Sequence, residues 1–125
     1  MKPRRRAVAG ALMAIALVLL PACGRDATDP TGASDCRELV ERASSTAKKV
    51  LKSIEGQTKA DLEGANPTDP FQPLTEPFER FKLRAAELGC DEGELRRLAC
   101  VAYRDLKPTG PAAEEYLARV VSTCS

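Results

Sequence analysis

Apolar residues follow two different patterns along the 125-residue chain. Residues 7–20 form one apolar run that contains no charged side chain. From residue 34 onwards, apolar residues recur instead at spacings of three and four, which is the period of a helix with one buried face. This second pattern predicts helices over about 34–55, 76–89, 91–106 and 111–124, separated by turns.

The apolar run lies in the setting of an export signal. Residues 1–6 carry four positive charges, and the small residues Ala22 and Gly24 follow the run. Fourteen helical residues span about 21 Å, which is short of the roughly 30 Å hydrocarbon core of a membrane. A charged start, a short apolar run and small residues after it are typical of a secretory signal peptide. We assign residues 1–22 to this signal.

The end of the run reads Leu20, Pro21, Ala22 and Cys23. This segment resembles the signal box of bacterial lipoproteins, which has Leu three positions before a Cys and a small residue directly before it. Pro21 stands where that family favours Ala, Ser, Thr or Val. The resemblance implies that the Cys23 thiol receives a diacylglyceryl group and that a peptidase cuts before it. The protein would then be lipid-anchored at the extracytoplasmic face of the cell membrane.

A second cleavage route stays open. Ala22 and Gly24 flank Cys23 as two small residues, which also suits ordinary signal cleavage before Arg25. That route would discard Cys23 and release a soluble secreted protein. Residues 24–34 are polar and rich in Gly, Pro, Ser and Thr, so they cannot bury enough apolar surface to order themselves. For the anchored form we therefore expect residues 23–34 to be a lipidated Cys with a flexible tether, followed by a helical domain over 35–125.

The first two predicted helices have recognisable ends. Ser34 or Asp35 can cap the first helix, and helical propensity continues through 59–63. Four prolines within 64–77 predict a connection rather than a helix, with Thr75 capping the second helix and Gly89 ending it. The apolar faces are Leu39, Val40, Ala43, Ala47, Val50, Leu51 and Ile54 in the first helix, and Phe71, Leu74, Phe78, Phe81, Ala85 and Leu88 along the connection and second helix.

The last two helices are marked by their first turns. Asp91 with Glu94 has the spacing of a capping box, and Thr109 can cap the fourth helix, whose first turn accepts Pro111. The apolar faces are Leu95, Leu98, Ala99, Ala102 and Leu106, and then Ala113, Tyr116, Leu117, Val120, Val121 and Cys124. The pattern as a whole predicts an all-α fold, a small antiparallel bundle of about four helices stapled by two disulfides.

The five cysteines fit this arrangement. Without Cys23 an even set of four remains, which in a short exported chain indicates two disulfides. Four cysteines allow three pairings. An up-and-down bundle brings Cys36, Cys90 and Cys124 to one pole, with Cys100 about 10 Å along the third helix. We favour Cys36–Cys90 with Cys100–Cys124, although the second pair requires the C-terminus to fold back.

Composition excludes several classes of function. The chain has no His, so His-ligated zinc sites and Ser-His-Asp or Cys-His catalysis are excluded. Removing residues 1–22 leaves 15 basic and 18 acidic residues, a net charge of −3. Together with 4% aromatic residues, this argues against a nucleic-acid partner. We also expect no metal site, no cofactor and no redox pair, since there is no C-x-x-C.

Three functions are weighed against one another. The favoured one is a non-catalytic envelope lipoprotein that binds an envelope protein or surface component, and the second is a small-molecule or lipid carrier, which would need a cavity between the helices. The third is an enzyme, but its candidate carboxylates have no nucleophile and no metal-ligand spacing beside them. These candidates are Glu76, Glu79, Glu87, Asp91, Glu114 and Glu115.

Residues 86–90 (AELGC), with an acidic cap after them, resemble small helical exported proteins of actinobacteria, a group of unknown function, so this resemblance implies no activity.

Overall fold

The computed structural model describes residues 27–64 and 66–124, and the secondary structure of these residues is entirely helical. None of the helices in this described part is long and apolar enough to cross a membrane. The α-helices are Cys36–Ser53 (α1), Lys59–Glu63 (α2), Gln72–Thr75 (α3), Glu79–Leu88 (α4), Glu92–Tyr103 (α5) and Pro111–Val120 (α6), and the 3-10 turns are Pro30–Gly32 (η1), Glu76–Phe78 (η2) and Ser122–Cys124 (η3).

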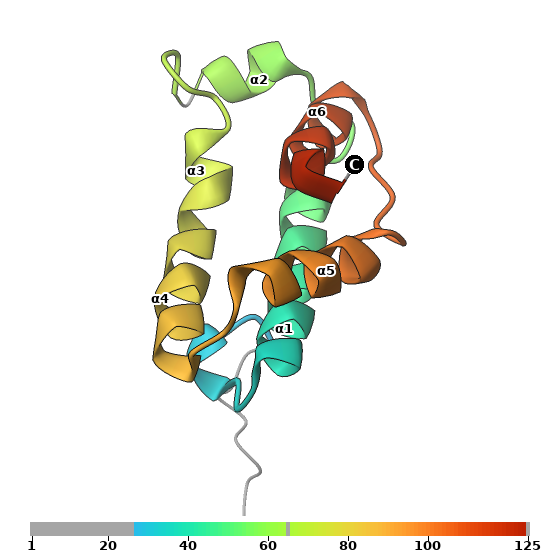
Figure 1. The fold of residues 1–125 in the computed structure, drawn as a ribbon. Helices are drawn as coiled ribbons and strands as arrows, with labels where there is room; N and C mark the ends of the chain where they lie inside the picture. Colours follow the sequence, from blue (N-terminus) through green and yellow to red (C-terminus); the bar gives the residue numbers. More distant parts are fainter. Residues whose placement is uncertain (1–26, 65, 125) are drawn as a thin grey trace, which may run out of the picture.

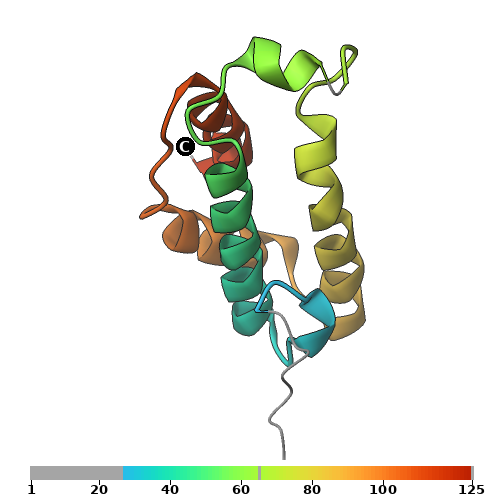
Figure 2. The same ribbon diagram turned by 180° about the vertical axis from the view of Figure 1, so that it is seen from behind.

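Two helical columns form the frame of the molecule. α1 and the column of α3, η2 and α4 lie side by side and run in opposite directions (Figures 1 and 2). α5 lies across α1 on one face of this pair, and η1 lies over the ends of α1 and α4 on the opposite face. The predicted all-α, disulfide-linked bundle is confirmed. Within it, α5 crosses α1 instead of running alongside it.

α1 follows its sequence prediction closely. The Asp35 side chain accepts a hydrogen bond from the Glu38 amide at 2.8 Å and is the N-cap. The Glu38 carboxylate in turn accepts bonds from the amide and hydroxyl of Ser34, at 3.0 and 2.8 Å. Both predicted cap residues therefore take part in starting α1. The apolar face is buried as expected, with Ala47 fully inaccessible.

The chain turns sharply after α1, so α2 is a separate helix. Gly56 has a positive φ of 73°, which ordinary side chains rarely adopt, and its amide donates to the Thr109 carbonyl at 2.9 Å. A Cβ on Gly110, whose φ is also positive, would lie 3.0 Å from the Cα of Gly56. The two connections therefore meet at two glycines. The prediction that Thr109 caps α6 is wrong, because Gly110 occupies the N-cap position and this helix has no side-chain cap.

The second column begins earlier than the sequence predicts. α3 starts at Gln72, and Thr75 does not act as a side-chain cap, because its hydroxyl donates to the Gln72 carbonyl at 3.0 Å. Pro73 and Pro77 do not interrupt the column, because each lies in the first turn of a helical segment, where no backbone donor is needed. Phe71, expected to pack the connection onto the core, is only 1% exposed.

Both disulfides have the favoured pairing. Cys36–Cys90 joins the first residue of α1 to the turn between α4 and α5, with the two Cα atoms 5.8 Å apart. Cys100–Cys124 joins α5 to η3, with a Cα separation of 5.5 Å. The C-terminus does fold back, and η3 is the element that achieves this, since the Cys124 amide donates to the Val121 carbonyl at 2.9 Å.

Candidate functional site

Cys23, the predicted lipidation site, lies outside the described residues, but the chain shortly after it is well defined. The expectation of a flexible tether as far as Ser34 is wrong for residues 29–34. Asp29 caps η1 by accepting from the Thr31 amide at 3.0 Å, and Ala33 is 1% exposed in the core. The sequence prediction rested only on the polar composition of this segment. It did not include the hydrogen bonds that side chains of α1 and α4 form with it.

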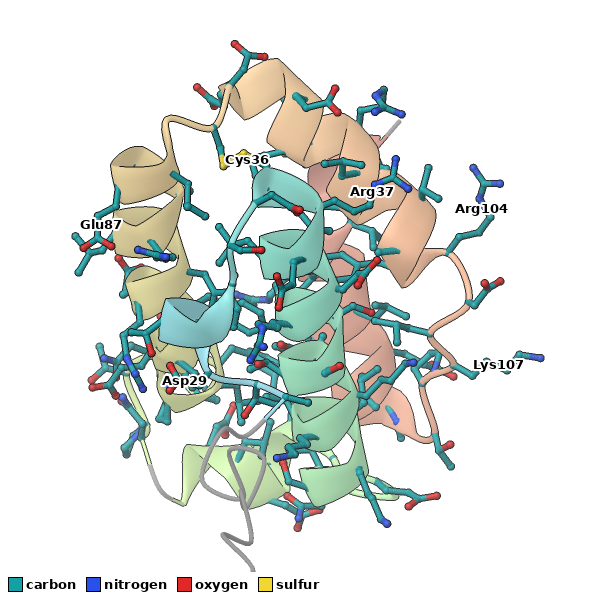
Figure 3. The ribbon with its side chains drawn as sticks, turned by 90° about the horizontal axis from the view of Figure 1, so that it is seen from below. Asp29, Cys36, Arg37, Glu87, Arg104 and Lys107 are labelled. Carbon is teal, nitrogen blue, oxygen red and sulfur yellow. A yellow bond between two sulfur atoms is a disulfide. The ribbon has the colours of Figure 1, made fainter. Side chains whose placement is uncertain are left out.

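Three arginines hold this N-terminal segment against the helices. Arg42 of α1 donates to the Asp29 carbonyl at 3.1 Å, and Arg84 of α4 donates to the Ala33 carbonyl at 2.8 Å. Arg80 of α4 forms an ion pair with the Asp29 carboxylate at 3.3 Å. Figure 3 shows Asp29 beside η1, at the side of α1. The segment around Asp29 and Ala33 is therefore fixed to both helical columns.

Glu38 connects this segment to the start of α1. Bonds from the Ser34 amide and hydroxyl, and then from Arg42, lower the pKa of the Glu38 carboxyl from 4.5 to about 2. The Arg42 guanidinium lies 3.0 Å from the same carboxylate, and its side chain is 17% exposed. The Glu38 carboxylate, in the first turn of α1, thus binds both Ser34, which precedes the N-cap, and Arg42, which holds η1.

The lowered pKa of Glu38 predicts that the folded protein loses stability in acid. Because the folded-state pKa of Glu38 is below its unfolded value, the carboxylate contributes stability above about pH 4.5 and loses it as the pH falls towards 2. We expect Glu38→Gln to be less stable than wild type near neutral pH, and the difference to shrink over this range. Urea unfolding of both proteins at each pH measures it. A constant difference down to pH 2 would contradict the prediction.

Most of the candidate carboxylates of the enzyme hypothesis have structural partners of their own. Glu79, Glu87 and Glu115 each pair with a cation on their own helix, at 2.8, 2.9 and 3.0 Å. Asp91 caps α5 by accepting from the Glu94 amide at 3.0 Å, as predicted. Glu76 and Glu114 are exposed. Among the described residues, no group of three potential metal ligands is close enough together to hold an ion.

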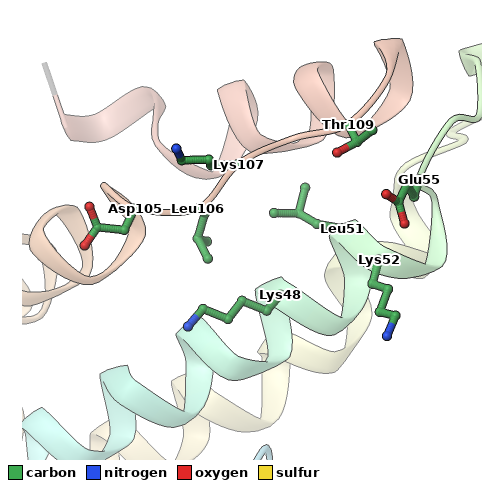
Figure 4. Close-up of a pocket in the computed structure, with 8 residues that line it drawn as sticks. All are labelled: Lys48, Leu51, Lys52, Glu55, Asp105, Leu106, Lys107 and Thr109. Atoms are coloured by element: carbon green, nitrogen blue, oxygen red, sulfur yellow. The ribbon is translucent and has the colours of Figure 1, made fainter.

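One hollow is lined by charged residues at the end of α1. It measures about 230 Å³ and includes Lys48, Lys52 and Lys107, with Glu55 and Asp105 nearby. Figure 4 shows these lysine side chains pointing in different directions, with Leu51 and Leu106 between them. The lysines do not converge on a common point, so the hollow does not resemble a built anion site.

A second, apolar hollow lies between α1, α5 and the second column. Its walls come from α1, from η2 with α4, and from α5, and its volume is about 200 Å³. We call it the apolar groove, and the residues that line it are Leu39, Val40, Ala43, Phe78, Phe81, Lys82, Ala85, Leu95, Ala99 and Tyr103. The sequence predicts most of these residues to be core, and six of the ten are buried, so the groove is a surface opening above the core.

Two buried tyrosines lie near this groove. Burial raises the pKa of Tyr103 to about 12, and no hydrogen bond or charge among the described residues adds to that effect. Burial also raises the pKa of Tyr116, which is fully inaccessible, and the neighbouring Tyr103 raises it further. The Tyr116 hydroxyl has no hydrogen-bond partner in the described part of the chain. The core beside the groove therefore holds phenol groups that stay neutral at physiological pH.

Comparison with known protein families, with curated proteins and with solved structures found no match to this chain.

Proposed function

We propose that this protein is an exported lipoprotein, anchored through Cys23 to the extracytoplasmic face of the cell membrane, and that its helical domain is a non-catalytic binding module. The observation that carries the proposal is the cysteine pairing. Cys36 pairs with Cys90 and Cys100 pairs with Cys124, so Cys23 is the one cysteine of the five left over for lipid. Disulfides form and persist in oxidising compartments, which supports export.

The ordered segment from Asp29 onwards shortens the proposed tether between Cys23 and the domain. A tether of 12 residues, as the sequence predicts, could extend by about 40 Å. Because Asp29 is already held by Arg42 and Arg80, only about six residues separate the fixed part of the domain from Cys23. Six residues reach at most about 20 Å. The proposed anchor would therefore keep the face carrying η1 close to the membrane, which favours a partner at the envelope over a distant one.

Replacing the Cys23 thiol tests the anchor directly. We expect Cys23→Ser to move the protein from the membrane fraction to the soluble exported fraction, because serine has no thiol to receive the diacylglyceryl group. Asp26→Ser is the matched control, since it places the same residue three positions later, and it should stay with membranes. Retention of both variants would contradict anchoring through Cys23.

The intact mass of the exported protein separates the two cleavage routes. Under the proposal, the mass begins at Cys23 and includes a diacylglyceryl group, and reduction adds about four hydrogens for two disulfides. A mass that begins at Arg25 without lipid would identify the alternative, a soluble secreted helical protein. In that case the search for partners would move from the envelope to the medium.

A further inference from the structure

The two disulfides differ in the exposure of the cysteines that form them. Cys36 and Cys90 are both half-buried, and Cys90 packs against the hydrophobic core. Cys100 is half-buried in α5, whereas its partner Cys124 is exposed. Cys124 is therefore the only exposed residue among the four paired cysteines, and one side of the Cys100–Cys124 bond faces solvent.

The two disulfides also differ in what they hold in place. Cys36–Cys90 joins the first residue of α1 to the turn after α4, where the Cys90 amide donates to the Ala85 carbonyl at 3.0 Å. Cys100–Cys124 joins α5 to η3, a single 3-10 turn that lies against α5 and α6. Opening the second bond would therefore free one short turn, whereas opening the first would detach the start of a long helix.

Thiol–disulfide exchange requires access to only one sulfur of a bond. A thiolate attacks that sulfur, and the other sulfur leaves as a thiolate. The absence of a C-x-x-C motif argues against a dithiol oxidoreductase, but it does not protect an exposed sulfur from an external thiol. Exposed disulfides are the labile and regulatory ones in proteins. The exposure of Cys124 therefore distinguishes one bond of the two, and one sulfur of that bond.

We propose that Cys124 is a site of reversible modification by a low-molecular-weight thiol, and that this modification releases η3 from α5. The attacking thiolate forms a bond to the Cys124 sulfur, and the bond between Cys124 and Cys100 breaks. The Cys100 sulfur leaves with the electron pair and takes up one proton, which replaces the proton lost by the attacking thiol. The product is a mixed disulfide on Cys124 and a free Cys100 thiol, so one disulfide replaces another and no further reductant is needed.

The reverse step is built into the same pair. The freed Cys100 thiol can attack the mixed disulfide on Cys124, which restores the original bond and expels the small thiol. Cys36–Cys90 is untouched in both directions and keeps the start of α1 beside the α4–α5 turn. The Cys100–Cys124 bond thus couples the surface that η3 covers on α5 and α6 to the thiol content of the surroundings. The inference goes beyond the anchored binding module, since it holds whether Cys23 carries lipid or not.

The order in which the two disulfides react tests the proposal. The protein studied is the exported Cys23→Ser chain, in which all four remaining cysteines are paired. It is treated with glutathione, free thiols are alkylated at successive times, and peptide mass spectrometry locates both groups. We expect glutathione on Cys124 and alkylated Cys100 to appear at least about tenfold faster than any product at Cys36 or Cys90. Equal rates, or glutathione on Cys100 instead of Cys124, would overturn the proposal.

The same reaction in the unfolded chain is the control for exposure. In concentrated guanidinium chloride all four sulfurs are accessible, so we expect the two disulfides to react at rates within about threefold of each other. A preference that keeps its full size in the unfolded chain would arise from neighbouring residues along the sequence and not from the fold. That result would also overturn the proposal.

Two matched substitutions identify the exposed sulfur. In the Cys23→Ser chain, Cys100→Ser leaves Cys124 as the free thiol and Cys124→Ser leaves Cys100, and both variants lack the same disulfide. We expect Cys100→Ser to react with dithionitrobenzoate at least about tenfold faster than Cys124→Ser, because Cys124 is exposed and Cys100 is half-buried. Equal rates would contradict the assignment of Cys124 as the site of attack.

Release of η3 is measured by amide exchange and circular dichroism. After modification by glutathione, we expect exchange at the Cys124 amide, which donates to the Val121 carbonyl, to accelerate by at least about tenfold. Exchange at the Cys90 amide and the far-ultraviolet helical signal should stay as in the unmodified protein. An unchanged Cys124 amide, or loss of most of the helical signal, would show that the bond does not hold a releasable turn and would overturn the proposal.

Discussion

Cys36→Ala together with Cys90→Ala is expected to lower the free energy of unfolding by about 4 kcal/mol. The disulfide closes a loop with a sequence separation of 54 residues, and the chain-entropy cost of leaving that loop open in the unfolded protein gives this figure. A small domain has a total stability of about 5–15 kcal/mol, so this single change removes a large share of it. Urea unfolding, followed by far-ultraviolet circular dichroism, measures the loss.

Removing the second disulfide should cost slightly less stability than removing the first. Cys100–Cys124 closes a loop with a separation of only 24 residues, and the same arithmetic gives about 3.5 kcal/mol for its removal. The Cys36–Cys90 variant should show an additional local effect, because this bond fixes the start of α1 beside the turn that follows α4. Amide exchange at Ser34 and Glu38 should accelerate in that variant alone. A loss below about 1 kcal/mol for Cys36–Cys90 would show that the unfolded chain is already restrained.

The sequence predicts local structure well where neighbouring residues determine it. Asp35 caps α1 because the acceptor and the orphan amides are three residues apart, and Asp91 caps α5 in the same way. The Cys36–Cys90 pair follows from topology, because an antiparallel pair of helices brings the start of one beside the end of the other, whereas Cys100–Cys124 also needs the C-terminus to fold back. Such relations depend on spacing along the chain, which the sequence contains in full.

The features that the sequence does not predict depend on distant partners. The Ala33 carbonyl is held by Arg84, 51 residues away, and the polar composition of residues 24–34 contains no sign of that bond. The apolar groove exists because α5 crosses α1, and helical periodicity identifies the buried face of a helix but not its crossing angle. Phe78 and Ala99 pack against the core as expected, but the sequence does not predict that they also border a concavity.

Phe71 is one of the largest fully buried side chains, so its replacement should have one of the largest effects of any core substitution. It is 1% exposed, and the Arg119 guanidinium lies 4.4 Å from its ring centroid. Phe71→Ala should lower the free energy of unfolding by about 3–5 kcal/mol, because the change removes a buried ring and leaves a cavity. The residue immediately precedes α3, so its ring fixes the position of the whole α3–α4 column against α6.

Phe78→Ala is the matched control for this prediction. Phe78 is half-buried and borders the apolar groove, so the same change removes less buried surface and opens an existing concavity rather than a closed void. We expect it to cost less than half as much as Phe71→Ala. Arg119→Gln should cost only about 0.5–1 kcal/mol, since the arginine side chain is 51% exposed. Equal losses for the two phenylalanines in thermal and urea unfolding would mean that Phe71 does not hold the connection in place, and that the early start of α3 comes from Pro73 and Pro77 alone.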